Sequence, residues 1–163
     1  MCIRDSLCSG KDIALVTDAG TPGISDPAYR LIRAAIDKNC RVESVPGASA
    51  LLTALVSSGL PTDRFIFEGF LPQKKGRKGK LERIKDIDAT IIFYESPNRL
   101  KRTLKDILEH IGDRPAAVGR ELSKKYEEIM RGKGSDILSH FTINKPKGEF
   151  VIIIGKDDPN VYF

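Results

Sequence analysis

The run Asp18–Pro27 combines residue types that build a backbone pocket for a ligand. It reads Asp-Ala-Gly-Thr-Pro-Gly-Ile-Ser-Asp-Pro and stands between an apolar stretch at 13–16 and a helical pattern at 29–36. Gly20 and Gly23 admit backbone angles and close approaches that a side chain would block. Loops of this kind at the carboxyl ends of parallel strands are where α/β proteins bind nucleotide-like ligands. A plain connection needs less length and fewer prolines, so ligand binding is the favoured interpretation.

A second loop, Pro46-Gly-Ala-Ser49, has similar composition at the end of the next predicted strand. Taken alone, it is an ordinary connection in which Ser49 caps the following helix. Because successive parallel strands end at the same edge of a sheet, we expect the two loops to lie together. Their backbone amides would then form half of a pocket for one shared ligand.

A basic run follows in the second half of the chain and has the charge density to contact a phosphate backbone. Gly76 and Gly79 interrupt it, and glycines let such a loop mould to its partner. A solvated, flexible loop explains the run as well as RNA contact does. The salt dependence of RNA binding separates these two interpretations. Six cations lie within ten positions: Lys74, Lys75, Arg77, Lys78, Lys80 and Arg83.

Two further segments join a carboxylate to an arginine at the end of a predicted strand. Glu95 precedes the turn that leads to Arg99, and Arg120 stands directly before Glu121. Each glutamate is either a site residue or a structural carboxylate. Each arginine binds either a phosphate or an acid, and an Arg120–Glu121 ion pair is the default expectation.

The composition excludes several classes of protein. The 163 residues are 40% hydrophobic, which is enough for a core, and the net charge of +5 is compatible with a polyanionic partner. Three cysteines without a CxxC pair and only two histidines argue against a zinc site and for a reduced, cytoplasmic setting. The longest apolar runs are far shorter than the roughly 18 residues of a membrane span. We therefore expect no metal and no membrane partner.

Alternating strand and helix patterns must position these segments. Strands at 13–17 and 41–45, with helices at 27–38 and 49–58, predict a parallel sheet. After Asp63 two strands follow one another without a helix between them, which predicts a mixed sheet. The predicted domains are 12–61 and 62–163. The elements of the second are strands 64–69, 89–94, 116–121, 126–131 and 149–154, and helices 80–85, 99–111 and 136–141.

The first residues stand apart from this pattern. They show no sustained period, and the ordered pattern begins abruptly at Asp12. The opening Met-Cys-Ile-Arg-Asp-Ser resembles a spurious leader on translated environmental fragments. We therefore expect residues 1–11 to be a non-native or disordered head on a chain truncated at its amino end.

Taken together, these segments resemble the ribosomal small-subunit RNA (cytidine-2′-O)-methyltransferase family, within the tetrapyrrole methylase superfamily. The match runs from about residue 12 to residue 156, and its specificity comes from seven segments in one order. They are residues 15–27, 45–49, 59–65, 67–72, 93–99, 119–122 and 147–150.

The resemblance implies a two-domain α/β architecture, with an incomplete parallel-sheet first domain and a mixed-sheet second domain. It also implies a homodimer that binds S-adenosylmethionine (SAM) in the cleft between domains. The superfamily's Gly-Asp-Pro cofactor loop falls on Gly20-Thr21-Pro22, where Thr21 replaces the acid. The cofactor-binding residues implied are Asp18, Ala19, Gly20, Thr21, Ile24, Ser49, Ala50, Glu95, Leu122 and Gly148.

The activity implied is methylation of a cytidine ribose 2′-hydroxyl in small-subunit ribosomal RNA. Positioning supplies much of such a transfer, and Glu95 and Glu121 are the candidate general bases. The family's first strand and its glycine-rich amino-terminal loop are absent, and Asn98 stands where the family typically has histidine. The residues expected to hold RNA are Lys74, Lys75, Arg77, Lys78, Arg99 and Arg120.

Two alternatives stay open. One is a methylase of the same superfamily that acts on a tetrapyrrole or a protein. The other is a basic RNA-contact fragment without activity. SAM titration separates the catalytic from the inactive interpretation, and assays on ribosomal subunits against tetrapyrrole precursors separate the two enzymes.

Overall fold

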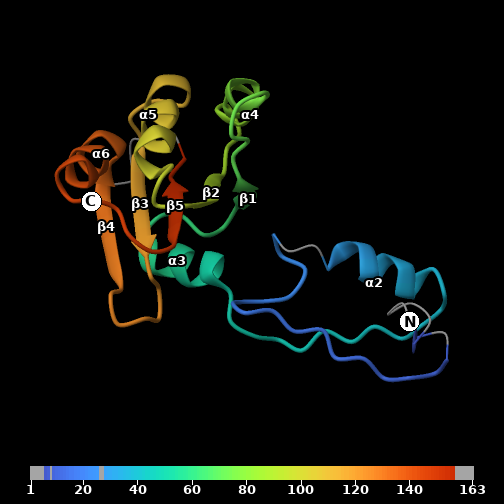
Figure 1. Ribbon diagram of the computed structural model, residues 1–163. Helices are drawn as coiled ribbons and strands as arrows, with labels where there is room; N and C mark the ends of the chain where they lie inside the picture. Colours follow the sequence, from blue (N-terminus) through green and yellow to red (C-terminus); the bar gives the residue numbers. More distant parts are fainter. Residues whose placement is uncertain (1–5, 8, 26–27, 157–163) are drawn as a thin grey trace. The chain divides into compact units, whose positions relative to one another are not determined.

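The computed structural model of the chain describes residues 6–7, 9–25 and 28–156 (Figure 1). Its contacts divide the chain into two compact units, Met1–Ser49 and Ala50–Phe163, and each is described by itself. The expected head at 1–11 lies partly outside the described residues, as do Asp26 and Pro27 at the end of the first loop.

The described part of the first unit contains helix α2, Tyr29–Ile36, within the predicted helix at 27–38. The strands predicted at 13–17 and 41–45 do not form among the described residues, so the expected parallel sheet is not observed there. A strand exists through hydrogen bonds to a neighbouring strand, and apolar residues alone do not create one. Val16 and Val45 illustrate this, because each stays 84% exposed.

The second unit is built on a five-stranded mixed sheet, as the sequence predicts (Figure 1). The strand order is β1-β2-β5-β3-β4, where β1 and β2 run parallel and the other neighbours pair antiparallel. All five residues of central β5 are buried, as expected for a strand covered on both faces. The bounds are β1 Phe65–Phe70, β2 Thr90–Glu95, β3 Pro115–Arg120, β4 Glu128–Lys133 and β5 Phe150–Ile154.

Helices cover both faces of this sheet. Helices α4 (Arg77–Ile84), α5 (Leu100–His110) and α6 (Gly134–Ile143) pack on one face, and α3 (Ala50–Ser58) packs on the other. Alternation along β2 explains the two cores, since successive strand residues point to opposite faces. Ile91 and Phe93 join the core under α4–α6, and Ile92 joins the core under α3. The predicted boundary at 61/62 follows α3, whereas the contacts group α3 with this sheet.

The topology brings several loops to one edge of the sheet. Strands β2 and β3 are both antiparallel to β5, so they run in the same direction, and β1 is parallel to β2. The carboxyl ends of β1, β2 and β3 therefore meet the amino end of β5 at what we call the carboxyl edge. Residue pairing shows this directly, because Glu95 and Arg120 both lie opposite Phe150.

None of the described helices combines the length and the apolar character needed to span a membrane.

Candidate functional site

The two glycine-rich loops of the first unit contact one another, although the parallel strand ends from which the sequence predicts this contact do not form. The Thr21 hydroxyl donates a hydrogen bond to the carbonyl oxygen of Ala48 at 3.1 Å. Gly20 has a left-handed φ of +71°, and a Cβ placed on it would lie 3.8 Å from the same carbonyl oxygen. Asp18, Ala19 and Gly20 are exposed, so their own side chains do not plug this backbone surface.

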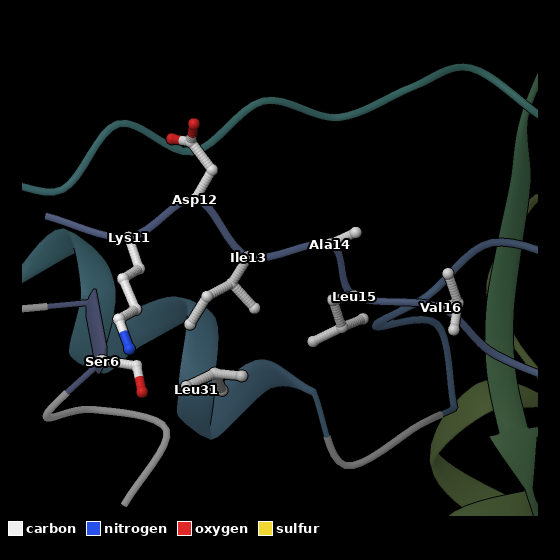
Figure 2. Close-up of a pocket in the computed structure, with 8 residues that line it drawn as sticks. All are labelled: Ser6, Lys11, Asp12, Ile13, Ala14, Leu15, Val16 and Leu31. Atoms are coloured by element: carbon white, nitrogen blue, oxygen red, sulfur yellow. The ribbon is translucent and has the colours of Figure 1, made fainter.

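A hollow elsewhere in the first unit does not coincide with these loops. Figure 2 shows the apolar side chains of Ile13 and Leu15 beside Leu31 of α2. Residues 11–16, Ser6 and Leu31 line it, and none of the predicted cofactor residues does. The loop contact, and not this hollow, is therefore the feature that matches the predicted ligand site.

At the carboxyl edge of the second unit, Glu95 is buried in a polar network. Its side chain is fully enclosed, and Arg99 Nε lies 3.2 Å from one carboxylate oxygen. The amide of Ser96 donates to the same oxygen at 2.8 Å. The hydroxyl of Thr103, on α5, donates to the other oxygen at 2.6 Å. Every carboxylate oxygen of Glu95 thus has a partner within the fold.

Arg77, the first residue of α4, joins the same network from the other side. The residue is only 4% exposed. Its guanidinium donates to the Thr103 hydroxyl at 2.7 Å, to the Pro72 carbonyl at 3.1 Å and to the Asp106 carboxylate at 2.5 Å. We call Glu95, Arg99, Thr103, Arg77 and Asp106 the clasp, because they tie the loop before α4 to the start of α5.

The clasp corrects three of the predicted roles. Glu95 presents no free carboxylate to a substrate or a cofactor, because both of its oxygens are occupied inside the protein. Arg77 is buried and fully engaged, so it is not available to a phosphate. Arg99 donates to the Leu71 carbonyl as well as contacting Glu95, and thus positions the loop at 71–76.

Glu121 closes a strained turn at the same edge. Its φ is +46° and that of Ser123 is +65°, conformations that side chains other than glycine rarely adopt. The Glu149 amide donates to the Glu121 carboxylate at 2.8 Å, and Lys124 bridges Glu121 at 3.3 Å and Glu149 at 2.8 Å. The Glu149 amide, and then Lys124, hold the Glu121 pKa below its usual value, which makes this carboxylate a weak base.

Gly148 permits this arrangement of Glu121. Its φ is +88°, and a Cβ built on it would lie 2.5 Å from the Glu121 side chain. Leu122, the next residue of the turn, lies over Gly119, where a Cβ would be 3.1 Å from its methyl group. The two glycines therefore make room for two of the predicted site residues. The structure shows no ligand role for either glycine.

Arg120 does not form the expected ion pair with Glu121. Its guanidinium contacts Glu128, across the β3–β4 pair, at 3.3 Å and donates to the Lys147 carbonyl at 2.8 Å. Arg120 follows the strand and Glu121 begins the turn, so the two side chains take different partners.

Most of the basic run is helical, because α4 begins at Arg77 and not at residue 80, and only Lys74 and Lys75 precede the helix. Lys80 pairs with Glu68 at 2.9 Å. Lys74, Lys75 and Lys78 are exposed and remain the members of the run best placed to meet an external anion.

Sequence reasoning missed Thr103 and Asp106, which complete the clasp. Thr103 belongs to the buried stripe of α5 together with Leu100, Leu104 and Ile107. A hydroxyl within an apolar stripe was the available signal, since a buried polar group needs a partner. Among the described residues, no group of three or more His, Cys, Asp or Glu could hold a metal ion.

Replacing the central hydroxyl tests the clasp. Thr103→Val keeps the volume but removes one buried hydrogen bond from Glu95 and one from Arg77. We expect the free energy of unfolding to fall by about 1–3 kcal/mol, measured by urea denaturation. Thr142→Val, on an exposed hydroxyl of α6, is the matched control and changes stability by less than about 0.5 kcal/mol. Equal effects in both variants would contradict the clasp.

The contribution of the Glu121 carboxylate to the free energy of unfolding depends on pH. A carboxyl whose pKa is lowered by folding stabilises the protein above its unfolded pKa and loses that contribution as the pH falls through the folded value. The usual value is 4.5 and the folded value lies below it. We expect Glu121→Gln to be less stable than wild type at pH 7. The two urea midpoints should converge as the pH falls below 4.5 and through the folded value. A difference that stays constant with pH would show that the charge of Glu121 does not hold the turn.

Comparison with known proteins identifies the family. The sequence profile of the "Tetrapyrrole (Corrin/Porphyrin) Methylases" matches residues 2–138. A protein of Thermotoga maritima named ribosomal RNA small subunit methyltransferase I is 47% identical over 152 residues, which cover 93% of this chain and 68% of that protein. A Bacillus subtilis protein of the same name is 48% identical over 93% of this chain and 52% of its own length. The chain thus spans about half to two thirds of these relatives.

Solved structures share the fold at low sequence identity. The methyltransferase CobJ superimposes with a TM-score of 0.70 and 19% identity, over 94% of this chain and 68% of that one. The uroporphyrin-III C-methyl transferase of Thermus thermophilus, solved with S-adenyl homocysteine, has a TM-score of 0.57 and 17% identity, over 82% and 62%. With its profile match, its close relatives and this fold, the chain belongs to the tetrapyrrole methylase family.

Proposed function

We propose that this chain is part of a SAM-dependent methyltransferase that modifies a cytidine ribose 2′-hydroxyl in small-subunit ribosomal RNA. The names of its relatives support the coarser statement, rRNA small-subunit methylation. The cytidine and the 2′-oxygen come from the sequence resemblance. The homodimer implied by that resemblance belongs to the same proposal.

The contact between Thr21 and Ala48 is the observation that carries the cofactor assignment. It joins two glycine-rich loops that are far apart in sequence. Left-handed glycines and exposed backbone at this contact suit a ligand that approaches the main chain closely. The residues proposed to hold SAM in the first unit and at the start of α3 are Asp18, Ala19, Gly20, Thr21, Ile24, Ser49 and Ala50. Leu122 and Gly148 stay in the proposal on the resemblance alone.

When bound, SAM supplies a methyl group already activated by its sulfonium. For that methyl group to be transferred, the residues proposed above would hold SAM beside the ribose 2′-hydroxyl, whose proton would pass to solvent. Glu95 is enclosed and Glu121 is a weak base, so we assign neither of them the proton. The contribution proposed for the described residues is to position cofactor and RNA, which supplies much of such a reaction.

Methyl transfer is tested with labelled SAM and purified small ribosomal subunits. We expect label in the RNA, and nuclease digestion with mass spectrometry should place it on a 2′-O-methylcytidine. Tetrapyrrole precursors are assayed in parallel. Label on a tetrapyrrole instead of RNA would replace the proposed substrate. SAM binding below the millimolar range is also expected, and RNA binding without SAM binding would favour the inactive fragment.

The loop assignment is tested at Gly20. A β-branched residue at a left-handed φ strains the backbone by about 1–3 kcal/mol, so Gly20→Val should weaken SAM binding about tenfold or more in calorimetry. Gly10→Val is the matched control, because Gly10 is also left-handed, at +79°, and lies outside both loops. Unchanged affinity in Gly20→Val, or equal losses in both variants, would remove the loops from the cofactor site.

A further inference from the structure

The amino-terminal parts of α4 and α5 lie together, and the two helices run in the same direction. At their starts, Arg77 of α4 contacts Thr103 of α5. At their ends, Glu82 of α4 lies 3.2 Å from His110 of α5. The two helix starts therefore form one continuous surface next to the loop at 71–76.

Both helix starts carry cations where a helix favours anions. The first turns of α4 and α5 contain no acidic residue. They contain Lys78 in α4 and Lys101 and Arg102 in α5. The backbone dipole makes the start of a helix positive, so each exposed cation there is unfavourable by about 0.3–1 kcal/mol. Residues that lower the stability of the fold are typical of a binding surface. A bound anion would interact favourably with both the cations and the helix starts.

The clasp leaves the charge of Arg102 only partly compensated. The Asp106 carboxylate is 2.5 Å from the buried Arg77 and 3.8 Å from Arg102, whose side chain is 60% exposed. The Asp106 carboxylate thus contacts two guanidinium groups, and the shorter contact is with Arg77. Lys105, three residues after Arg102, is also exposed and shares its helix face.

We propose that the RNA phosphate backbone binds across the starts of α4 and α5, with Arg102 and Lys105 as contact residues beyond the basic run. The exposed members of that run, Lys74, Lys75 and Lys78, border the same surface. Its cations are spread over a loop and two helices, which fits a chain of phosphates better than a single small anion. The clasp holds Arg77 and Arg99 inward as positioning residues. This inference rests on the proposed function for the identity of the RNA.

The test measures the salt dependence of binding to a labelled RNA from the small subunit. Arg102→Gln/Lys105→Gln should lower affinity about tenfold at low salt. It should also flatten the slope of log K against log salt by about 1.4–1.8, which corresponds to two lost phosphate contacts. The matched control is Lys85→Gln/Lys133→Gln, which removes the same charge at the opposite edge of the sheet. It should keep the wild-type slope.

A second variant separates charge from folding. Arg102→Lys/Lys105→Arg keeps both charges and should bind RNA with the wild-type slope. A wild-type slope in the neutral variant, or an equal loss in the charge-keeping variant, would overturn the inference. SAM binding of each variant is measured by calorimetry in the same series. If SAM does not bind to wild type while the slope changes as expected, the methyltransferase proposal fails and the RNA surface stands.

Discussion

The buried carboxylate of Glu95 is the constraint on which the carboxyl edge depends. An ionised group enclosed by protein is tolerated only when it is paired and hydrogen-bonded, and Glu95 has Arg99, Thr103 and a backbone amide. The Thr103 hydroxyl also accepts a hydrogen bond from Arg77, whose guanidinium donates to the Pro72 carbonyl as well. The loop before α4, the end of β2 and the start of α5 are thereby fixed to one another. Removing one member leaves a buried polar group of its neighbours short of one partner, so the members of the network depend on one another.

This arrangement divides the arginines and lysines into two groups with different roles. Arg77 and Arg99 contact carbonyl and carboxylate oxygens within the fold. Lys74, Lys75 and Lys78 remain exposed beside them. A binding surface benefits from such a division, because cations held on a rigid base lose less freedom when a polyanion binds. At the end of β3, Lys124 and the Glu149 amide contact the Glu121 carboxylate. These contacts stabilise the strained backbone of the Glu121 turn, which would otherwise relax.

In the proposed function, the first unit contributes in a different way, through its backbone. Thr21 stands where the superfamily's cofactor loop has an acid, and its hydroxyl is used to join that loop to Ala48. The proposed ligand surface is thus made of main-chain groups and small residues, and histidines and metal-binding clusters play no part in the proposal. His110 and His140 instead contact the glutamates Glu82 and Glu128. The relatives' names and the shared fold agree with this picture at the level of a methyltransferase family.

From the sequence alone, the order of helices and strands after Asp63 and the mixed sheet could be predicted. Periodicity and turn residues are local, so in this half of the chain they indicate the type and order of the elements. The two glycine-rich loops do contact one another, but the parallel strands from which that contact was expected do not form. The strands at 13–17 and 41–45 could not be predicted correctly, because a strand requires a partner that local pattern does not reveal. The roles of Glu95, Arg77 and Glu121 were also decided by tertiary structure. Whether a charged side chain faces solvent or a buried partner depends on residues such as Thr103 and Asp106, which only folding brings within hydrogen-bonding distance.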